Sequence, residues 1–263
     1  MSVTHELGDD EQVSGDLLRL PRAQDLVEIR TDPRYPLIID PNHKDASEHF
    51  GVLRSRLLNA RAKSGISSVV VASSQPQEGK SLICMNLALS LAQLGKERIL
   101  LVDGDLRMGG ITALLGLQQS LGLADFLQER ELFDVCVRTT TVPCLSVAPT
   151  GTVSEESLPS ILEGSRWVEF LNRAKREFGL VIIDSVPVSA PIADFELLLA
   201  GCDAALLVVQ LRKTTREALD VTTQRLNGKL LGLVVNNTEP RNDVEHYYYA
   251  RGKKNNQRAN GNK

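Results

Sequence analysis

The sequence predicts an α/β fold built around a doubly wound, mostly parallel sheet. Short segments rich in Val, Ile and Leu alternate along the chain with longer segments of helical periodicity, as in parallel strands joined by crossover helices. Two of the apolar segments lead into polar loops that contain Gly79-Lys80-Ser81 and Asp103-Gly104-Asp105. Because the ligand sites of open parallel sheets lie at the carboxyl ends of the strands, we expect these loops to meet at one site.

Residues 1–45 are expected to form an extended or disordered leader. The segment is polar, is acidic at its start and is interrupted by prolines, which favour turns and extended chain over helices. A helix is predicted to begin at Ala46, because Phe50, Leu53 and Leu57 form an apolar stripe at helical spacing.

The segment from Val69 to Ser81 is predicted to form a strand and a phosphate-binding loop. The loop's backbone N–H groups and the following helix, predicted over residues 82–94, would face the phosphates, Lys80 would reach the β/γ oxygens and Ser81 would hold Mg²⁺. The loop departs from the full pattern, because Ser74 and Gln77 stand where glycine is usual and glutamine lacks the conformational freedom of glycine. The alternative is a chance Gly-Lys-Ser in a surface turn.

Two later apolar segments end in aspartates. Residues 98–102 lead into Asp103 and Asp105, and residues 180–183 lead into Asp184. We expect these three carboxylates to converge near the phosphate-binding loop. Phosphoryl transfer needs carboxylates to hold the metal and to accept the proton of the nucleophile, whereas a single strand-terminal aspartate often only caps a turn or a helix.

The remaining elements extend the same alternation and predict one domain over residues 46–237. Residues 238–263 are expected to be disordered, because they are rich in Arg, Lys, Asn and Gly and almost free of aliphatic side chains. Further strands are predicted at Cys144–Ala148, Ala204–Val209 and Leu231–Val235, and helices around Ile161–Glu177 and Thr215–Leu226.

Composition narrows the class of protein. The chain has 263 residues, of which 42% are hydrophobic, and its formal net charge of −3 with no basic stripe argues against a nucleic-acid partner. Its four cysteines lack metal-binding spacing and are expected to be reduced core residues of a cytoplasmic protein. The sequence shows no signal peptide and no apolar stretch of spanning length, so we expect a membrane role only through a partner.

The combined motifs resemble those of the bacterial tyrosine kinases of exopolysaccharide synthesis, the BY-kinases, which are related to the MinD/ParA ATPases. The family's loop, Ser-x-x-Pro-Gly-Glu-Gly-Lys-Ser, aligns with residues 73–81, with Gln77 in place of the middle glycine. The family's Asp-x-Asp-x-Arg motif aligns with residues 103–107, and its Asp-x-Pro-Pro motif aligns with residues 184–187, with Val186 in place of the first proline. Gln75 stands where the MinD/ParA-type ATPases carry a second, signature lysine, and its absence favours the kinase branch.

The resemblance implies ATP and Mg²⁺ as cofactors and assigns roles to individual residues. Lys80, Asp103 and Asp105 are the implied catalytic residues, with Asp103 favoured over Asp105 to accept the tyrosine proton. Ser81, Asp105 and Asp184 are the implied Mg²⁺ ligands. The implied nucleotide-binding residues are Gln77, Glu78, Gly79, Lys80, Ser81, Leu82, Arg212 and Asn236.

Three positions keep alternatives open. Asn236 is placed to read adenine in the family, but it also suits the turn at a strand end. Arg107 is expected to hold the aspartate loop or to contact phosphate, unless it is an ordinary surface arginine. Asp194 fits the family pattern and equally suits a helix cap.

The resemblance also gives a purpose to the tyrosines near the C-terminus. Tyr247, Tyr248 and Tyr249 would be the phosphoacceptors of a neighbouring subunit; the alternative is a sticky or packed terminus. The family carries a subunit-contact helix with the motif Glu-x-x-Arg-x-x-Arg. Residues 48–54 match its outer Glu and Arg but have Gly51 at the middle position, so homo-oligomer formation is implied less strongly than nucleotide binding.

The sequence therefore predicts an ATP-dependent protein-tyrosine autokinase that regulates capsule or exopolysaccharide production. The implied partner is the cytoplasmic segment of a membrane polysaccharide co-polymerase, which would recruit the protein to the inner face of the cell membrane. The alternatives are a P-loop ATPase or nucleotide-binding switch without kinase activity, and a scaffold subunit without turnover.

Overall fold

The structure, a computed structural model, describes residues 26–32, 34–153, 161–163, 165–190 and 193–237. Its centre is a seven-stranded sheet with the order β3-β4-β2-β5-β1-β6-β7. Every strand pair is parallel except β3 with β4, so the predicted doubly wound, mostly parallel sheet is confirmed. The strands are β1 (Ser68–Ser73), β2 (Ile99–Asp103), β3 (Arg138–Thr139), β4 (Leu145–Ala148), β5 (Leu180–Asp184), β6 (Ala204–Gln210) and β7 (Leu230–Asn236).

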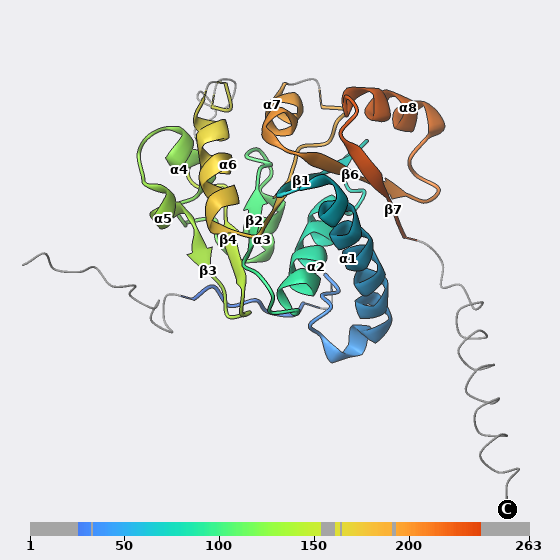
Figure 1. Ribbon diagram of the computed structural model, residues 1–263, viewed down its shortest axis with the longest axis horizontal. Coiled ribbons are helices and arrows are strands. Elements are labelled where there is room, and N and C mark those ends of the chain that lie inside the picture. Colours follow the sequence, from blue (N-terminus) through green and yellow to red (C-terminus); the bar gives the residue numbers. More distant parts are fainter. Residues whose placement is uncertain (1–25, 33, 154–160, 164, 191–192, 238–263) are drawn as a thin grey trace, which may run out of the picture.

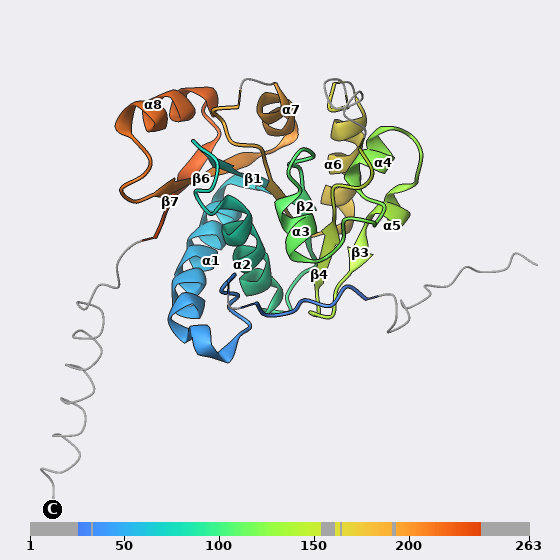
Figure 2. The same ribbon diagram turned by 180° about the vertical axis from the view of Figure 1, so that it is seen from behind.

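Helices cover both faces of the sheet (Figures 1 and 2). Helices α1 and α2 contribute to the core on one face, and α4 to α7 contribute to the core on the other. The helices are α1 (Lys44–Ser64), α2 (Lys80–Ala92), α3 (Gly110–Leu114), α4 (Leu123–Leu127), α5 (Phe133–Cys136), α6 (Arg166–Glu177), α7 (Asp194–Gly201) and α8 (Arg216–Arg225), and a short 3₁₀ helix, Pro41–His43, precedes α1.

The central strands are apolar throughout because both of their faces are buried. Successive side chains of a strand point to opposite faces. In β1, Val70 and Ala72 join the core under α6 and α7, whereas Val69 and Val71 join the core under α1 and α2. A strand buried on both sides has no polar face, which explains the continuous Val/Ile/Leu runs in the sequence.

Most predicted elements lie within a few residues of their observed bounds. Helix α6 begins at Arg166, five residues after the predicted start, and α1 begins at Lys44, two residues before it. The sequence does not predict α3, α4, α5, α7 or β3. Helices of four to eight residues and a strand of two residues carry too little periodicity to detect.

The described part of the leader, predicted to be extended or disordered, packs on the domain. It is extended, but Val27 exchanges backbone hydrogen bonds with Thr139 and Thr141 (2.9 Å each). Val27, Ile29, Leu37 and Ile38 are all buried in the core beside α2. Val27 and Ile29 alternate with the charged Glu28 and Arg30, so this part of the segment is polar by composition while one side of it contributes to the core. Residues 1–25 lie outside the described residues.

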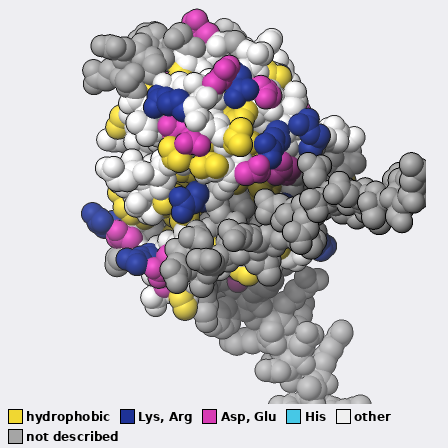
Figure 3. Space-filling model, turned by 90° about the vertical axis from the view of Figure 1, so that its left-hand side faces the viewer, with side chains coloured by type: hydrophobic (Ala, Val, Ile, Leu, Met, Phe, Trp, Pro, Cys, Tyr) yellow, Lys and Arg dark blue, Asp and Glu magenta, His cyan; other side chains and the backbone are white. Residues whose placement is uncertain are grey.

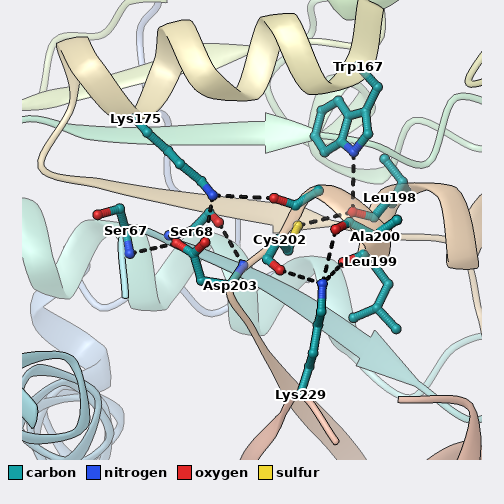
Figure 4. Close-up of polar contacts among 11 residues, drawn as sticks. Ser67, Ser68, Trp167, Lys175, Leu198, Leu199, Ala200, Cys202, Asp203 and Lys229 are labelled. Atoms are coloured by element: carbon teal, nitrogen blue, oxygen red, sulfur yellow. Dashed lines mark hydrogen bonds and ion pairs between the residues drawn. The ribbon is translucent and has the colours of Figure 1, made fainter. Parts of the chain in front are cut away.

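A polar network at the amino ends of β1 and β6 fastens helices to the sheet (Figure 4). Asp203 Oδ2 accepts hydrogen bonds from the backbone N–H groups of Ser67 and Ser68 (2.9 Å each), and Lys175 Nζ donates to Asp203 Oδ1 (2.6 Å). Burial acts to raise the pKa of Asp203, but the hydrogen bonds from Lys175 and the backbone outweigh it and lower the pKa below its usual range. The network ties α6 to the amino ends of β1 and β6.

Charges of both signs are mixed on the side of the molecule shown in Figure 3. An ion pair joins helices α5 and α6, at the left of Figure 1, and Arg173 Nη2 lies 2.7 Å from Asp134 Oδ1. This intermixing accords with the small net charge of the chain.

The four cysteines are free thiols. Cys84, Cys136 and Cys202 are buried, as predicted for core residues, and Cys144 is half-buried. Within the described residues, the structure contains no helix with the length and apolar character needed to cross a membrane.

Candidate active site

The predicted phosphate-binding loop lies between the end of β1 and the start of α2. Gly79 precedes α2 with a φ of +91°, and Lys80 is the first residue of the helix. Strand β5 lies between β1 and β2 in the sheet, with Asp184 beside Val71 on one side and beside Asp103 on the other. The sheet order therefore brings the loop and the aspartates together, as the sequence predicts.

Lys80 and Asp184 form a buried ion pair. Lys80 Nζ lies 2.5 Å from Asp184 Oδ1, and the two side chains are 7% and 0% exposed. Burial alone would lower the pKa of Lys80, but the neighbouring Asp184 carboxylate outweighs burial and raises the pKa above its ordinary value. The Lys80 ammonium therefore stays charged. A positive charge is thus held at the loop without bulk water around it.

Asp103 is fully buried behind the cleft. Its Oδ2 atom accepts hydrogen bonds from the backbone N–H and the hydroxyl of Thr112 (2.7 Å each), and its Oδ1 atom has no hydrogen-bond partner. Burial, with the charge of Asp184 as the next cause, raises the pKa of Asp103 to about 7. Asp103 therefore stabilises the start of α3 and keeps one unpaired oxygen among the site carboxylates.

Asp105 faces the cleft, and Arg107 anchors the loop that carries it. Asp105 lies on the cleft wall, and its Oδ1 atom accepts a hydrogen bond from the Met108 N–H (3.1 Å). Burial is the main cause that raises the pKa of Asp105. Arg107 Nε donates to Asp194 Oδ2 at the start of α7 (2.9 Å). Of the alternatives for Arg107, the structure favours the one in which it holds the aspartate loop, and Asp194 is its partner.

The oxygens beside Asp184 fit a Mg²⁺ ion. Asp184 Oδ2 is buried and has no hydrogen-bond partner. A Cβ atom at Gly110 would lie 2.6 Å from Ser81 Oγ and 3.7 Å from Asp184 Oδ2, so glycine leaves space beside both oxygens. The described chain holds no group of three or more His, Cys, Asp or Glu side chains arranged to bind a metal alone. Mg²⁺ is commonly held by one or two carboxylates together with phosphate oxygens.

The site opens into a cleft of about 1370 Å³. Its inner wall contains five of the predicted nucleotide-binding residues, namely Gln77, Gly79, Lys80, Ser81 and Leu82. Its outer walls come from two segments, α3 with the residues that follow it and the described part of the leader. No sequence motif predicts that the leader belongs to the site. Tyr35, the only tyrosine among the described residues, lies on this wall and is 44% exposed. No motif in the leader signals this position.

Three predicted nucleotide-binding residues do not line the cleft. Glu78 is buried, where its carboxylate accepts a hydrogen bond from the Gln75 N–H (3.0 Å) and contacts the Thr214 hydroxyl. Asn236 Nδ2 donates to the Glu78 carbonyl (3.0 Å). Arg212 lies two residues beyond β6 and has a φ of +65°. The predicted phosphoacceptors Tyr247, Tyr248 and Tyr249 lie outside the described residues.

Several proteins are similar to this chain in sequence, although no protein-family model matches it. Tyrosine-protein kinase YwqD of Bacillus subtilis is 30% identical over 207 residues, which are 77% of this chain and 86% of YwqD. EpsB of Ralstonia solanacearum is 32% identical over 191 residues, which are 72% of this chain and 25% of EpsB. The succinoglycan biosynthesis transport protein ExoP of Rhizobium meliloti is 27% identical over 208 residues, which are 77% of this chain and 26% of ExoP. The chain thus spans most of YwqD and about a quarter of the two longer relatives.

Solved structures share the fold. The kinase domain of Escherichia coli tyrosine kinase ETK matches 81% of this chain and 84% of its own with a TM-score of 0.73 at 24% identity. The septum site-determining protein MinD of Pyrococcus horikoshii, solved with Mg-ADP, matches 64% of this chain and 68% of its own with a TM-score of 0.55 at 20% identity. At these identities the likeness concerns the fold alone.

Proposed function

The chain belongs to the family of bacterial tyrosine-protein kinases, and from this we propose that it transfers the γ-phosphoryl group of ATP to tyrosines of a neighbouring copy of itself. The observation that carries the proposal is the convergence of Lys80 with Asp103, Asp105 and Asp184 at the phosphate-binding loop. A surface turn with a chance Gly-Lys-Ser would have no reason to gather buried carboxylates around its lysine.

Different residues of the chain would bind the phosphates of ATP and the Mg²⁺ ion. In this proposal Lys80 would hold anionic phosphate oxygens, and Ser81, Asp105 and Asp184 would hold Mg²⁺. Bound Mg-ATP would supply the phosphoryl group together with the cation that offsets its developing charge. Because the transition state of phosphoryl transfer is loose, the protein mainly has to position groups and stabilise charge.

Two carboxylates remain candidates for the base that accepts the tyrosine proton. The sequence favours Asp103, and its raised pKa of about 7 suits a base working near neutral pH. Asp105 lies on the cleft wall, whereas Asp103 is buried behind it. We therefore assign the contact with the acceptor hydroxyl to Asp105 and a supporting role to Asp103.

The acceptors we propose are Tyr247, Tyr248 and Tyr249 of a second copy of the chain. The proposed activating partner is the cytoplasmic segment of a membrane polysaccharide co-polymerase, which would recruit the protein to the inner face of the membrane. The name of ExoP, a succinoglycan biosynthesis transport protein, supports a role in polysaccharide production. The second candidate, a nucleotide-binding switch without phosphoryl transfer, is favoured by the fold likeness to MinD.

Phosphosite mapping by mass spectrometry separates these functions. The full chain is incubated with Mg-ATP and the co-polymerase segment, beside a Lys80→Met control. Phosphate on Tyr247–Tyr249 that is missing in the control is the expected result. Unmodified tyrosines in a chain that still binds Mg-ATP would instead select the nucleotide-binding switch, and a phosphate on Tyr35 alone would assign a different acceptor.

A further inference from the structure

A lysine beyond β6 contacts the back of the phosphate-binding loop. Lys213 Nζ donates hydrogen bonds to the carbonyl oxygens of Pro76 (2.8 Å) and Gln77 (3.0 Å). The next carbonyl in the chain, that of Glu78, accepts the hydrogen bond from Asn236 at the end of β7. Three consecutive carbonyl groups of the loop, those of residues 76–78, are thus held by two side chains.

These contacts determine where the N–H groups of the loop point. In a trans peptide the C=O and N–H bonds point in opposite directions, and the described residues contain no cis peptide bond. The held carbonyls share their peptide groups with the N–H groups of Gln77, Glu78 and Gly79. None of these N–H groups donates a hydrogen bond to another described residue. Gln77 and Gly79 line the cleft while Lys213 does not, so the N–H groups face the cleft as an anion-binding cradle.

Gln77 is the point at which this cradle is strained. Its φ of +60° lies in the left-handed region, which glycine adopts freely and which other residues adopt only at a cost. Lys213 binds the carbonyl immediately before Gln77 and the carbonyl of Gln77 itself. The two hydrogen bonds therefore hold both peptide groups whose orientation depends on that unfavourable φ.

We propose that Lys213 is a positioning residue that holds the loop in its phosphate-binding conformation. It supplies through a side-chain clamp the conformation that a glycine at position 77 would adopt by itself. This inference rests on the proposed function, because the cradle is the site that would bind the phosphates of ATP. Lys213 touches the loop from behind and is not a catalytic residue.

The chain contains a matched control for this lysine. Lys229 Nζ donates to the carbonyls of Leu199 (2.9 Å), Ala200 (3.0 Å) and Cys202 (2.8 Å) at the end of α7. Figure 4 shows these contacts in the network that also contains Ser67, Ser68 and Asp203, at the amino ends of β1 and β6. A lysine ammonium thus also binds backbone carbonyls near the amino ends of the strands, whereas the phosphate-binding loop lies at their carboxyl ends.

The test is a set of Mg-ATP dissociation constants measured by calorimetric titration of the full chain. Lys213→Met is expected to weaken binding about tenfold, the scale of one lost charge-assisted contact. Lys213→Gln, which keeps a neutral donor, is expected to lie between the wild type and Lys213→Met. Lys229→Met is expected to lower the thermal midpoint and to leave the dissociation constant unchanged. Adding Gln77→Gly to Lys213→Met is expected to restore most of the lost affinity.

The rescue by glycine separates positioning of the loop from a general structural role. Unchanged affinity in Lys213→Met, with its fold verified by circular dichroism, would overturn the proposal. A loss that Gln77→Gly does not relieve would also overturn it, because the strain at position 77 would then not be what Lys213 offsets. If Lys213→Met does not fold, the same two outcomes are read from Lys213→Gln. A wild-type chain that does not bind Mg-ATP would overturn the proposed function as well.

Discussion

Gly79 is the most tightly constrained residue of the phosphate-binding loop. Its φ of +91° lies where side chains are rarely tolerated, and a Cβ atom would lie 2.2 Å from Asn236 Nδ2. Asn236 cannot withdraw without losing its hydrogen bond to the Glu78 carbonyl. The glycine is therefore required both by backbone conformation and by the close approach of the asparagine.

Gly79→Ala is expected to weaken Mg-ATP binding by at least about tenfold, because the loop and Asn236 have to move apart. Isothermal titration calorimetry measures the effect. Gly95→Ala is the control, since Gly95 has a φ of +63° and no atom within 4 Å of its added Cβ. The control introduces backbone strain without the clash, so its binding should match the wild type. Equal losses in the two variants would contradict this account of Gly79.

Asp203 makes the stability of the fold depend on pH. Its pKa in the folded chain lies below the ordinary value of 3.8, so its contribution is present above that value and is lost as the pH falls through the folded-state pKa. Asp203→Asn is expected to lower the free energy of unfolding by no more than about 1 kcal/mol at pH 7, given the partial exposure of the pair. The difference from the wild type should vanish well below pH 3.8.

Urea unfolding at a series of pH values measures this prediction. Asp134→Asn is a suitable control, because within the described part of the chain Asp134 pairs only with Arg173, on the surface. That change is expected to alter stability by a few tenths of a kcal/mol at most. A stability difference between wild type and Asp203→Asn that persists at low pH would show that the carboxylate charge is not what the network uses.

At the scale of single residues, the sequence predicts site members better than their partners. Lys80 and the aspartates follow from strand ends and a short motif, because both are local patterns. The contacts of Asn236 with the Glu78 carbonyl and of Arg107 with Asp194 join residues far apart in the chain. No local pattern encodes such pairs, so the sequence left the roles of these residues open.

At the scale of elements, helix α1 contains one glycine that weakens it and is followed by another that ends it. Gly51 lies inside the helix, and an added Cβ would meet only the end of the Arg54 side chain at 3.9 Å. Gly65 follows the helix with a φ of +67° and donates its N–H to the Arg61 carbonyl. The two positions therefore place opposite demands on the backbone.

Gly51→Ala is expected to raise the free energy of unfolding by up to about 1 kcal/mol, because alanine is the better helix former. Gly65→Ala is expected to lower it by about 1 kcal/mol, because alanine is strained in the left-handed region. Urea unfolding of both variants measures the contrast within one helix. A destabilising Gly51→Ala would mean that Gly51 serves a close contact that the single chain does not contain.

The sequence predicts the elements that have a clear local pattern, either a continuous apolar run or a motif that directly precedes them. Strands β1, β2 and β5 are continuous apolar runs, and α2 follows directly from the loop that precedes it. Helices α3 to α5 are only four or five residues long and are positioned by tertiary contacts such as those between Asp103 and Thr112. Such contacts leave no periodic trace in the sequence.

At the scale of the whole molecule, the described leader is part of the domain and of its cleft. Asn86 on α2 binds it through two hydrogen bonds, from Ile38 N–H to Oδ1 (2.8 Å) and from Nδ2 to the Pro36 carbonyl (3.0 Å). Leu37 between them is 1% exposed. The helix that begins at the phosphate-binding loop therefore also holds the segment that forms the outer wall of the cleft.

Leu37→Ala is expected to lower the free energy of unfolding by about 2–5 kcal/mol, the range for truncating a buried leucine. The control is Val52→Ala, because Val52 on α1 is 54% exposed and its truncation should have little effect. Chemical denaturation of the full chain measures both. A cost for Leu37→Ala no larger than that for Val52→Ala would mean that the leader does not pack on the domain in solution.

The central claim is that one copy of the chain phosphorylates the C-terminal tyrosines of another, and a mixing experiment tests it most directly. Lys80→Met, with its tyrosines intact, is mixed with a triple Tyr→Phe variant at 247–249 whose active site is intact. Mg-ATP and the co-polymerase segment are added, and phosphosites are mapped by mass spectrometry. The account predicts phosphate on Tyr247–Tyr249 of the Lys80→Met chain in the mixture but not when that chain is incubated alone. An unphosphorylated Lys80→Met tail in the mixture, under conditions in which the wild-type chain phosphorylates its own, would contradict it.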